Sequence, residues 1–217
     1  MVPAITSSTR ITLVSVTNDT LRDLADLHAR VFPIAYGQKF YDEVLNAGEL
    51  AKMVYYDNEY AGAICCRKEP SKYANFTARV YMMTLGVLKK YRNLGLGMCV
   101  CVCLPLCLLV RDYLHAETLF YDPGSILIEH IVETLRRQSD PIVTSIYLHV
   151  QTVNEAAIRF YTRNGFRIQS IVPNYYKLNE NRDAYVLARP IFHLYENGVQ
   201  QQQDQQHQIL QYNGLPS

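Results

Sequence analysis

The sequence has no excess of charge of either sign. Lys and Arg together number 21 and Asp and Glu number 20, which gives a formal net charge of +1 at pH 7. A strongly basic protein is drawn to nucleic acid or to an anionic membrane by its overall field, and a balanced one is not. The composition therefore predicts no direct nucleic-acid partner and no membrane, and we expect partners to be recognised at a local site.

The sequence also lacks the usual marks of export. Its first residues, MVPAITSSTR, contain no charged segment followed by an apolar run, so no signal peptide is predicted. The six cysteines are Cys65, Cys66 and a cluster between Cys99 and Cys107, a spacing that fits reduced thiols better than a disulfide framework. We expect a cytoplasmic protein, with the nucleus as a second location.

The length of 217 residues allows one domain with a core of its own. We expect that domain at residues 10–191, preceded by an extension at 1–9. Close to the end the chain becomes QQQQDQQHQ, which is too polar to pack. Residues 192–217 are therefore predicted to be a disordered, glutamine-rich tail.

Hydrophobic periodicity predicts an α/β fold in which helices flank a mixed sheet. The expected helices are 21–31, 40–53, 126–138 and 154–165. The expected strands are 11–17, a hairpin at 53–66 with its turn at 57–59, then 79–88, 145–150, 166–172 and 184–190, with a loop at 69–78. Asn18 or Asp19 is expected to cap the first helix, and Asn154 and Gly165 to begin and end the last one.

A glycine-containing loop follows the strand expected at 79–88. It runs from Arg92 to Gly97 as R-x-x-G-x-G. Glycines let a backbone approach an anion closely, and loop amides donate hydrogen bonds to pyrophosphate oxygens. The loop is not a Walker A motif, because no Lys-Ser/Thr follows, and the preceding hairpin argues against a Rossmann start. From these residues alone, a plain turn remains an equal alternative.

In its context the loop resembles the acyl-CoA loop, Q/R-x-x-G-x-G/A, of the GNAT superfamily of N-acetyltransferases. Further stretches are similar to the N-alpha-acetyltransferase 50 family, also called San, which supplies the catalytic subunit of NatE: VFPIAYGQKFYDEVLNAGELAKM, GAICCR, YMMTLGVLKKYRNLGLG, IYLHVQTVNEAAIRFYTRNGF and NYYK. They span residues 10 to 189 with one interruption. The resemblance implies a GNAT fold, whose mostly antiparallel sheet has a splayed strand pair that admits CoA, with acetyl-CoA as cosubstrate and no metal.

The resemblance also implies the reaction. In this family the N-terminal amine of a protein attacks the thioester of acetyl-CoA directly, with a preference for Met followed by an apolar residue and with lysine acetylation as a side activity. The family motifs assign deprotonation of the amine, through water, to Tyr81 in YMMTL and His149 in LHVQ. Without the resemblance, Tyr81 reads as a core or edge-strand aromatic and His149 as a core histidine.

The same resemblance assigns a substrate pocket and a cofactor site. The pocket residues are Phe32, Pro33, Ile34, Tyr36, Met83, Tyr175 and Tyr176. Apolar and aromatic walls suit a buried Met side chain, although Tyr175 and Tyr176 also fit an exposed hairpin turn. The cofactor residues are Leu85, Val87, Arg92, Asn93, Leu94, Gly95, Leu96, Gly97, Asn154, Ala157 and Tyr161. The last three share a helix face, and Tyr161 fits protonation of the leaving thiolate or simple packing.

One stretch does not belong to the family pattern. Residues 98–124 separate the glycine loop from SILIEHIVETL, which would otherwise follow it directly. A zinc site is disfavoured because the cysteines lack C-x₂-C spacing, and a membrane span is disfavoured by length and by Pro105. The favoured hypothesis is a retained intron, because codons at the two ends allow GT and AG and the flanks rejoin in frame.

Two functions follow from this. The first is an active N-α-acetyltransferase that acts on nascent or mature protein N-termini, with NatA-type catalytic and auxiliary subunits at the ribosome as partners. The alternative is a catalytically impaired GNAT-fold subunit of a ribosome-associated acetyltransferase complex, in which residues 98–124 disrupt the CoA site.

Overall fold

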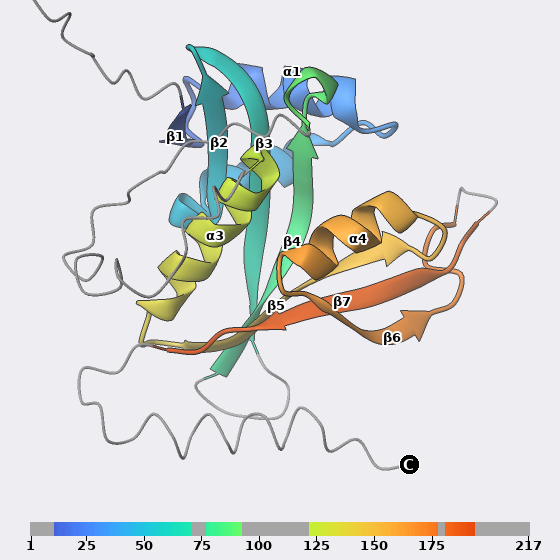
Figure 1. The fold of residues 1–217 in the computed structure, drawn as a ribbon. Helices are drawn as coiled ribbons and strands as arrows, with labels where there is room; N and C mark the ends of the chain where they lie inside the picture. The colour runs from blue at the N-terminus through green and yellow to red at the C-terminus, as the bar shows by residue number, and fades with distance from the viewer. Residues whose placement is uncertain (1–10, 71–76, 93–121, 178–180, 194–217) are drawn as a thin grey trace, which may run out of the picture. The chain divides into compact units, whose positions relative to one another are not determined.

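The computed structural model describes residues 11–70, 77–92, 122–177 and 181–193. Figure 1 shows the elements in order. The strands are β1 (Ile11–Ser15), β2 (Ala51–Tyr56), β3 (Glu59–Pro70), β4 (Thr77–Val87), β5 (Ile142–Gln151), β6 (Arg167–Val172) and β7 (Ala184–Pro190). The helices are α1 (Leu21–Val31), α2 (Gln38–Leu45), α3 (Pro123–Arg136) and α4 (Glu155–Arg163), and the 3₁₀ turns are η1 (Gly48–Leu50) and η2 (Lys89–Tyr91).

The strands form one seven-stranded sheet in the order β1-β2-β3-β4-β5-β7-β6. The pairs β1–β2, β2–β3, β5–β7 and β6–β7 are antiparallel, and β4–β5 is parallel. The parallel register runs from Thr77 opposite Ile142 to Tyr81 opposite Tyr147. A mixed sheet with flanking helices confirms the predicted fold class.

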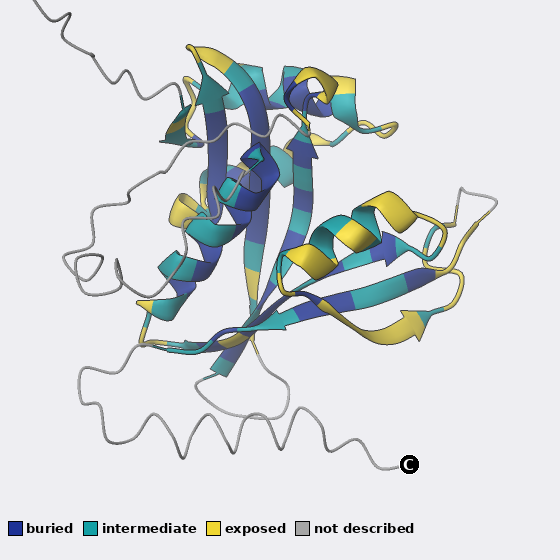
Figure 2. Ribbon diagram, in the orientation of Figure 1, coloured by how far each residue is buried: buried dark blue, intermediate teal, exposed yellow. Residues whose placement is uncertain are grey.

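The chain divides into two compact units. The first contains the described residues of Met1–Arg67 and Met82–Ile131. In it α1 and α2 lie on one face of the strands and the first part of α3 on the other, and Figure 2 shows the strands between them buried. Leu24 and Leu27 of α1 are fully buried, because the apolar stripe expected from the sequence faces the sheet.

The second unit contains the described residues of Lys68–Tyr81 and Val132–Ser217. Here α4 and β6 carry most of the exposed surface (Figure 2). The predicted ends of α4 are confirmed: the Asn154 side chain accepts a hydrogen bond from the Ala157 amide at 3.1 Å, and Gly165 has a φ of +80°. A left-handed residue after a helix favours glycine.

Three local predictions were wrong. The second helix ends at Leu45 rather than 53, because Ala51 already pairs with Cys65 in the sheet. The loop predicted at 69–78 is shorter, since β3 continues to Pro70 and β4 begins at Thr77. The N-cap of α1 is Thr20, and neither Asn18 nor Asp19 takes that position.

Helix α3 begins inside the stretch predicted to be an insertion. It starts at Pro123, and Asp122 caps it: the carboxylate accepts hydrogen bonds from the Gly124 amide at 2.9 Å and from the Ser125 hydroxyl at 3.0 Å. Proline suits the first turn of a helix because no intrahelical partner exists there for its missing N–H. The rest of the predicted insertion, 98–121, lies outside the described residues, as do its cysteines and the predicted tail from 194 onward.

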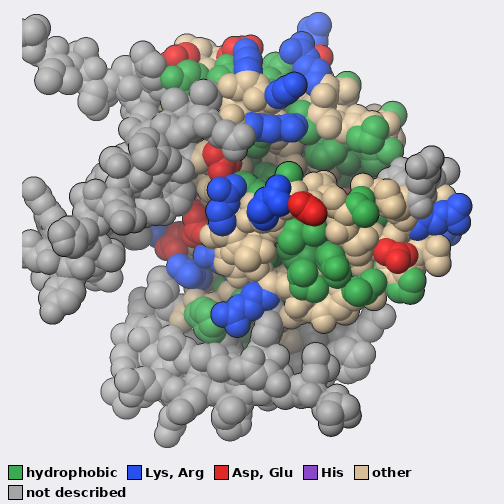
Figure 3. Space-filling view, turned by 45° about the vertical axis from the view of Figure 1, so that its right-hand side comes forward, with side chains coloured by type: hydrophobic (Ala, Val, Ile, Leu, Met, Phe, Trp, Pro, Cys, Tyr) green, Lys and Arg blue, Asp and Glu red, His purple; other side chains and the backbone are tan. Residues whose placement is uncertain are grey.

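The surface bears out the balanced composition. In Figure 3, Lys and Arg side chains stand near Asp and Glu side chains on the visible face. Several ion pairs link them, including Arg137 with Glu133 at 2.9 Å and Arg159 with Glu155 at 3.0 Å. No helix in the described ranges combines the length and apolar character that a membrane crossing requires.

Candidate active site

Strand β4 carries the predicted catalytic tyrosine and three other predicted site residues on one face. Its residues alternate in burial from Thr77 to Val87, as expected for a strand whose two faces differ. The partly exposed face holds Tyr81, Met83, Leu85 and Val87. The buried face holds Met82, Thr84 and Gly86. The pattern confirms a buried strand here and places the four predicted residues in line.

His149 and Tyr81 meet in an aromatic cluster of the second unit. Their ring centroids are 5.7 Å apart and nearly perpendicular. Tyr175 lies against both: its ring stacks on the His149 imidazole at 4.1 Å with an interplanar angle of 7°, and its hydroxyl is 3.1 Å from the Tyr81 hydroxyl. The structure therefore brings the two predicted catalytic residues together with a residue predicted only to bind substrate.

The segment between β6 and β7 is held in place by hydrogen bonds across its base. The Asn174 amide donates to the Asp183 carboxylate at 2.9 Å, and the Tyr176 amide donates to the Arg182 carbonyl at 2.9 Å. Asn174 has a φ of 54°, a conformation that asparagine tolerates better than most residues. The Tyr176 hydroxyl donates to the His149 carbonyl at 3.2 Å. Tyr175 is 38% exposed, so the turn is at the surface while its ring is engaged.

Burial shapes the acid–base character of the pair. It lowers the pKa of His149, while the Glu69 carboxylate raises that pKa and Arg79 lowers it. Burial and the hydrogen bond with Tyr175 raise the pKa of Tyr81. At neutral pH the imidazole is therefore a neutral base and the phenol keeps its proton. The His149 Nδ1 atom is buried and has no hydrogen-bond partner within the described part of the chain.

A second histidine, which the sequence analysis missed, lies in an aromatic cluster of the first unit. His28 of α1 is 1% exposed. Its ring centroid is 5.4 Å from that of Phe32 and 4.9 Å from that of Tyr36, two predicted pocket residues. Its Nε2 atom is 3.4 Å from the Thr84 hydroxyl. The sequence did indicate that His28 is buried, because position 28 follows Leu24 by one helical turn on the buried face of α1.

The segment after α1 shows which predicted pocket residues pack and which do not. A Cβ atom at Gly86 would lie 3.2 Å from Phe32 Cε2, so glycine gives the Phe32 ring room against β4. The Phe32 and Tyr36 rings are 5.8 Å apart. Pro33 and Ile34 are exposed, Ile34 by 55%. Within the first unit, Phe32 and Tyr36 are thus fixed by neighbours, and Pro33 and Ile34 face solvent.

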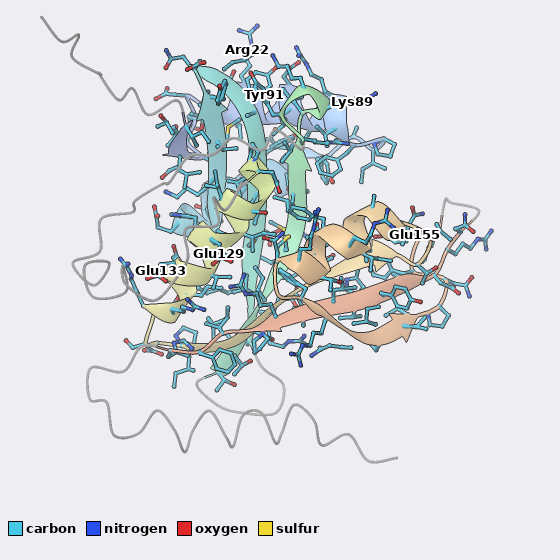
Figure 4. The ribbon with its side chains drawn as sticks, in the orientation of Figure 1. Arg22, Lys89, Tyr91, Glu129, Glu133 and Glu155 are labelled. Carbon is cyan, nitrogen blue, oxygen red and sulfur yellow. The ribbon has the colours of Figure 1, made fainter. Side chains whose placement is uncertain are left out.

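The start of the predicted cofactor loop is visible at the end of β4. Figure 4 labels Lys89 and Tyr91 of the η2 turn there. The Tyr91 hydroxyl donates to Glu59 at 2.7 Å, and the Arg92 Nε atom donates to the Val87 carbonyl at 2.8 Å. Arg92 is exposed, and its side chain binds the backbone of Val87, another predicted cofactor residue. The loop residues predicted next, Asn93, Leu94, Gly95, Leu96 and Gly97, lie outside the described residues.

Helix α4 carries the other predicted cofactor residues. The Asn154 side chain is used to cap the helix at the Ala157 amide. The Tyr161 ring lies 5.2 Å from that of Phe160 and 5.5 Å from that of the buried Phe166. These contacts give Tyr161 a packing role and leave a part in proton transfer open. Within the described ranges, no three His, Cys, Asp or Glu side chains are grouped so that they could hold a metal ion.

Comparison with known proteins defines the class. The model of the acetyltransferase (GNAT) family matches residues 19–98 and 124–166. Those two ranges include both strands that carry Tyr81 and His149 as well as helix α4. The chain belongs to the GNAT acetyltransferase family, as the sequence predicted, and the residues between the two matched ranges fall within the predicted insertion.

Relatives of known identity narrow the class. N-alpha-acetyltransferase 50 of Danio rerio is 36% identical over 182 residues, which are 84% of this chain and 89% of the relative. Probable N-acetyltransferase san of Drosophila melanogaster is 36% identical, over 83% of this chain and 81% of its own. The solved structure of Arabidopsis thaliana Naa50 in complex with the bisubstrate analogue CoA-Ac-MVNAL superposes with a TM-score of 0.64 at 34% identity, covering 83% and 99% of the two chains. The predicted resemblance to N-alpha-acetyltransferase 50 is confirmed.

Proposed function

We propose that this protein transfers the acetyl group of acetyl-CoA to the free α-amine at the N-terminus of other proteins. The observation that carries the proposal is the cluster in which Tyr81, His149 and Tyr175 contact one another. It contains one neutral base, His149, and the phenols of Tyr81 and Tyr175 in mutual contact. The relatives named N-alpha-acetyltransferase 50 support the same reaction.

The chemistry needs one base of modest strength. A peptide α-amine titrates near pH ~8, so removal of one proton makes it a nucleophile. The nitrogen lone pair then attacks the thioester carbonyl carbon, the C–S bond breaks, and CoA leaves as a thiolate that takes up a proton. His149 accepts the amine proton through a water hydrogen-bonded to its buried Nδ1 atom, which lacks a protein partner among the described residues.

Tyr81 has a different part in this scheme. Because its pKa is raised, it does not remove a proton at neutral pH. Its hydroxyl instead orients the water or the amine by hydrogen bonding, with the Tyr175 hydroxyl as its neighbour at 3.1 Å. Tyr161 remains a candidate for protonating the thiolate.

The substrate preference is a methionine followed by an apolar residue. Phe32, Tyr36 and Met83 would form apolar walls for the first side chain, and Tyr175 and Tyr176 would bind the peptide backbone. Burying a Met side chain is worth roughly 1.5–3 kcal/mol, enough to select it. The analogue bound to the Arabidopsis relative contains the peptide MVNAL, which begins with Met-Val. This peptide supports the proposed preference for methionine followed by an apolar residue. Lysine acetylation is a side activity in the proposal.

The cosubstrate would lie along the partly exposed face of β4. Leu85 and Val87 follow Tyr81 on that face, and Arg92 adds a positive charge beyond them. Helix α4 would contribute Asn154, Ala157 and Tyr161.

The partners and location remain part of the proposal. We place the protein in the cytoplasm, with the nucleus as a second site, and we expect NatA-type catalytic and auxiliary subunits at the ribosome to bind it. The domain would extend over 10–191 with the insertion at 98–124. The impaired-subunit alternative is not favoured, because the relatives that cover most of the chain are named as acetyltransferases.

Two measurements test the function. Acetyl-CoA should raise the melting temperature of the protein, since a ligand at 100 Kd adds about 2.7 kcal/mol to the free energy of unfolding. A peptide beginning Met-Val-Asn should then be acetylated at its α-amine, with a weaker rate for the same peptide beginning with Asp. Absence of both the shift and the product would overturn the proposal.

A further inference from the structure

Two oppositely charged side chains contact Tyr147, the neighbour of the catalytic pair, and the proposed mechanism does not use them. The Tyr147 hydroxyl donates a hydrogen bond to the Glu69 carboxylate at the end of β3. The Arg79 guanidinium of β4 lies over the Tyr147 ring, with its central carbon 4.2 Å from the ring centroid. Arg79 Nε also donates to the Ser145 hydroxyl at 3.1 Å. The ring is therefore held at its edge and on its face.

Tyr147 in turn contacts both members of the catalytic pair. It lies opposite Tyr81 in the parallel register, and the two ring centroids are 5.1 Å apart. It precedes His149 by two residues on the same strand, so the two side chains share a face, with ring centroids 6.2 Å apart. A shift of the Tyr147 ring would move the surface on which both residues rest.

We propose that Tyr147, clamped by Glu69 and Arg79, is a positioning residue for Tyr81 and His149, and that the carboxylate and the guanidinium that meet at the Tyr147 ring act on the neighbouring imidazole with opposite electrostatic effect. The inference rests on the proposed function in which His149 is the base. A carboxylate favours the imidazolium and a guanidinium disfavours it. The two charges have opposing effects on the pKa of His149, so removal of one charge leaves the effect of the other unopposed.

The other described residues that contact His149 or pair with it in the sheet are aromatic or aliphatic. Tyr81 and Tyr147 face it from β4 and β5, and Tyr175 and Tyr176 from the segment before β7. Across the antiparallel register His149 pairs with Val186, which carries no charge. Glu69 and Arg79 are thus the charges in the described part of this unit that act on the imidazole.

The experiment measures the His149 titration by NMR in the full-length protein. Glu69→Gln keeps a hydrogen-bond acceptor for Tyr147 and removes the charge, so the pKa of His149 should fall by about half a pH unit. Arg79→Gln should raise it by a similar amount, and Arg79→Lys, which keeps the charge, should leave it near the wild-type value. The matched controls are Glu133→Gln and Arg137→Gln, which break an ion pair between α3 and the residue that follows it and should not move it.

The rate profile separates this inference from the function on which it rests. With His149 as base, the low-pH limb of kcat moves to lower pH in Glu69→Gln and to higher pH in Arg79→Gln. A moved NMR titration with an unmoved kcat limb would support the clamp and reject His149 as the base. A titration that moves in neither variant, or moves the same way in both, overturns the inference. Tyr147→Phe, which keeps the ring and loses the Glu69 bond, should lower kcat several-fold with little change in KM.

Discussion

Two histidines in the described part of the chain lie in aromatic surroundings, and they differ in what lies beyond the rings. His28 in the first unit is 1% exposed and touches Phe32, Tyr36 and the Thr84 hydroxyl. His149 in the second unit stacks on a partly exposed tyrosine, and Glu69 and Arg79 shift the pKa of its imidazole in opposite directions. Burial lowers the pKa of both, that of His28 to about 4.

Under the proposed mechanism, in which His149 is the base, aromatic contact does not by itself make a histidine catalytic. His28 is almost fully buried, and no charge in the described part of the chain offsets the lowering of its pKa by burial, so it stays neutral and fills space. His149 has lost part of its water but keeps an accessible tyrosine partner and nearby charges. It can therefore take up a proton when a substrate delivers one.

The largest expected effect is on catalysis. His149→Ala should lower kcat by roughly 10²-fold or more with acetyl-CoA binding near wild type, as for loss of a general base, and Tyr81→Phe should do the same by removing the orienting hydroxyl. His28→Phe, which keeps an aromatic ring of similar size, should leave kcat within about threefold. Steady-state kinetics with a Met-Val peptide and calorimetry with acetyl-CoA check these outcomes. Wild-type turnover in either of the first two variants removes that residue from the mechanism.

The next effect is on the pH dependence of stability. The pKa of His28 is about 4 in the folded protein, against the ordinary value of 6.5 for a histidine side chain, so the unfolded chain binds the extra proton first. The folded state therefore keeps its full His28 contribution above about pH 6.5 and loses it as pH falls toward 4, by up to about 1.4 kcal/mol per pH unit. Urea unfolding between pH 7 and 4 should show this slope, and His28→Phe should flatten it. An unchanged slope would mean that His28 is not buried as described.

The third expected effect is on the affinity for acetyl-CoA, without a change in the titration of His149. Deleting residues 98–124 should tighten acetyl-CoA binding at least tenfold, because the glycine loop would then lead straight into α3 and its amides would face the pyrophosphate. The deletion acts in the unit that holds His28, so the His149 titration should not move. Deleting 98–121 instead keeps the Asp122 cap as a control for helix stability. Equal affinity of the full chain and both deletions would contradict the prediction.

The smallest effect is on substrate binding. Gly86→Ala places a methyl group 3.2 Å from the Phe32 ring, which forces the ring to shift by a few tenths of an ångström. KM for a Met-initiated peptide should rise by about two- to fivefold with kcat nearly unchanged. Gly37→Ala, at a position with no heavy atom near the added group, is the control. A kcat loss without a KM change would place Gly86 closer to the chemistry than we propose.

The sequence was sufficient for the fold class and for the two strands that carry the predicted catalytic pair, Tyr81 and His149. Periodicity and the paired motifs located β4, β5 and α4, and the capping role of Asn154 follows from its side-chain chemistry. The helix expected through residue 53 failed because the segment AKM has helical propensity but is paired on both sides in the sheet, and tertiary pairing overrides propensity.

The parts that could not be predicted depend on contacts distant in sequence. Glu69 and Arg79 flank a stretch that reads as a loop, and only strand pairing brings them to the Tyr147 ring, 78 positions from Glu69. The stack of Tyr175 on His149 likewise needs the β6–β7 hairpin to fold back over β5. No local pattern in the sequence predicts either set of contacts.

The parallel stack of His149 on Tyr175 also gives the site a spectroscopic signature. With the two rings 4.1 Å apart and 7° from parallel, the carbon-bound protons of the imidazole lie over the face of the phenol, where the circulating π electrons oppose an applied magnetic field. Their resonances should therefore appear upfield of those of an imidazole with no ring stacked on it. Loss of the upfield shift in Tyr175→Ala would assign these resonances to His149. Binding of a peptide beside Tyr175 should change the chemical shift of the same resonances.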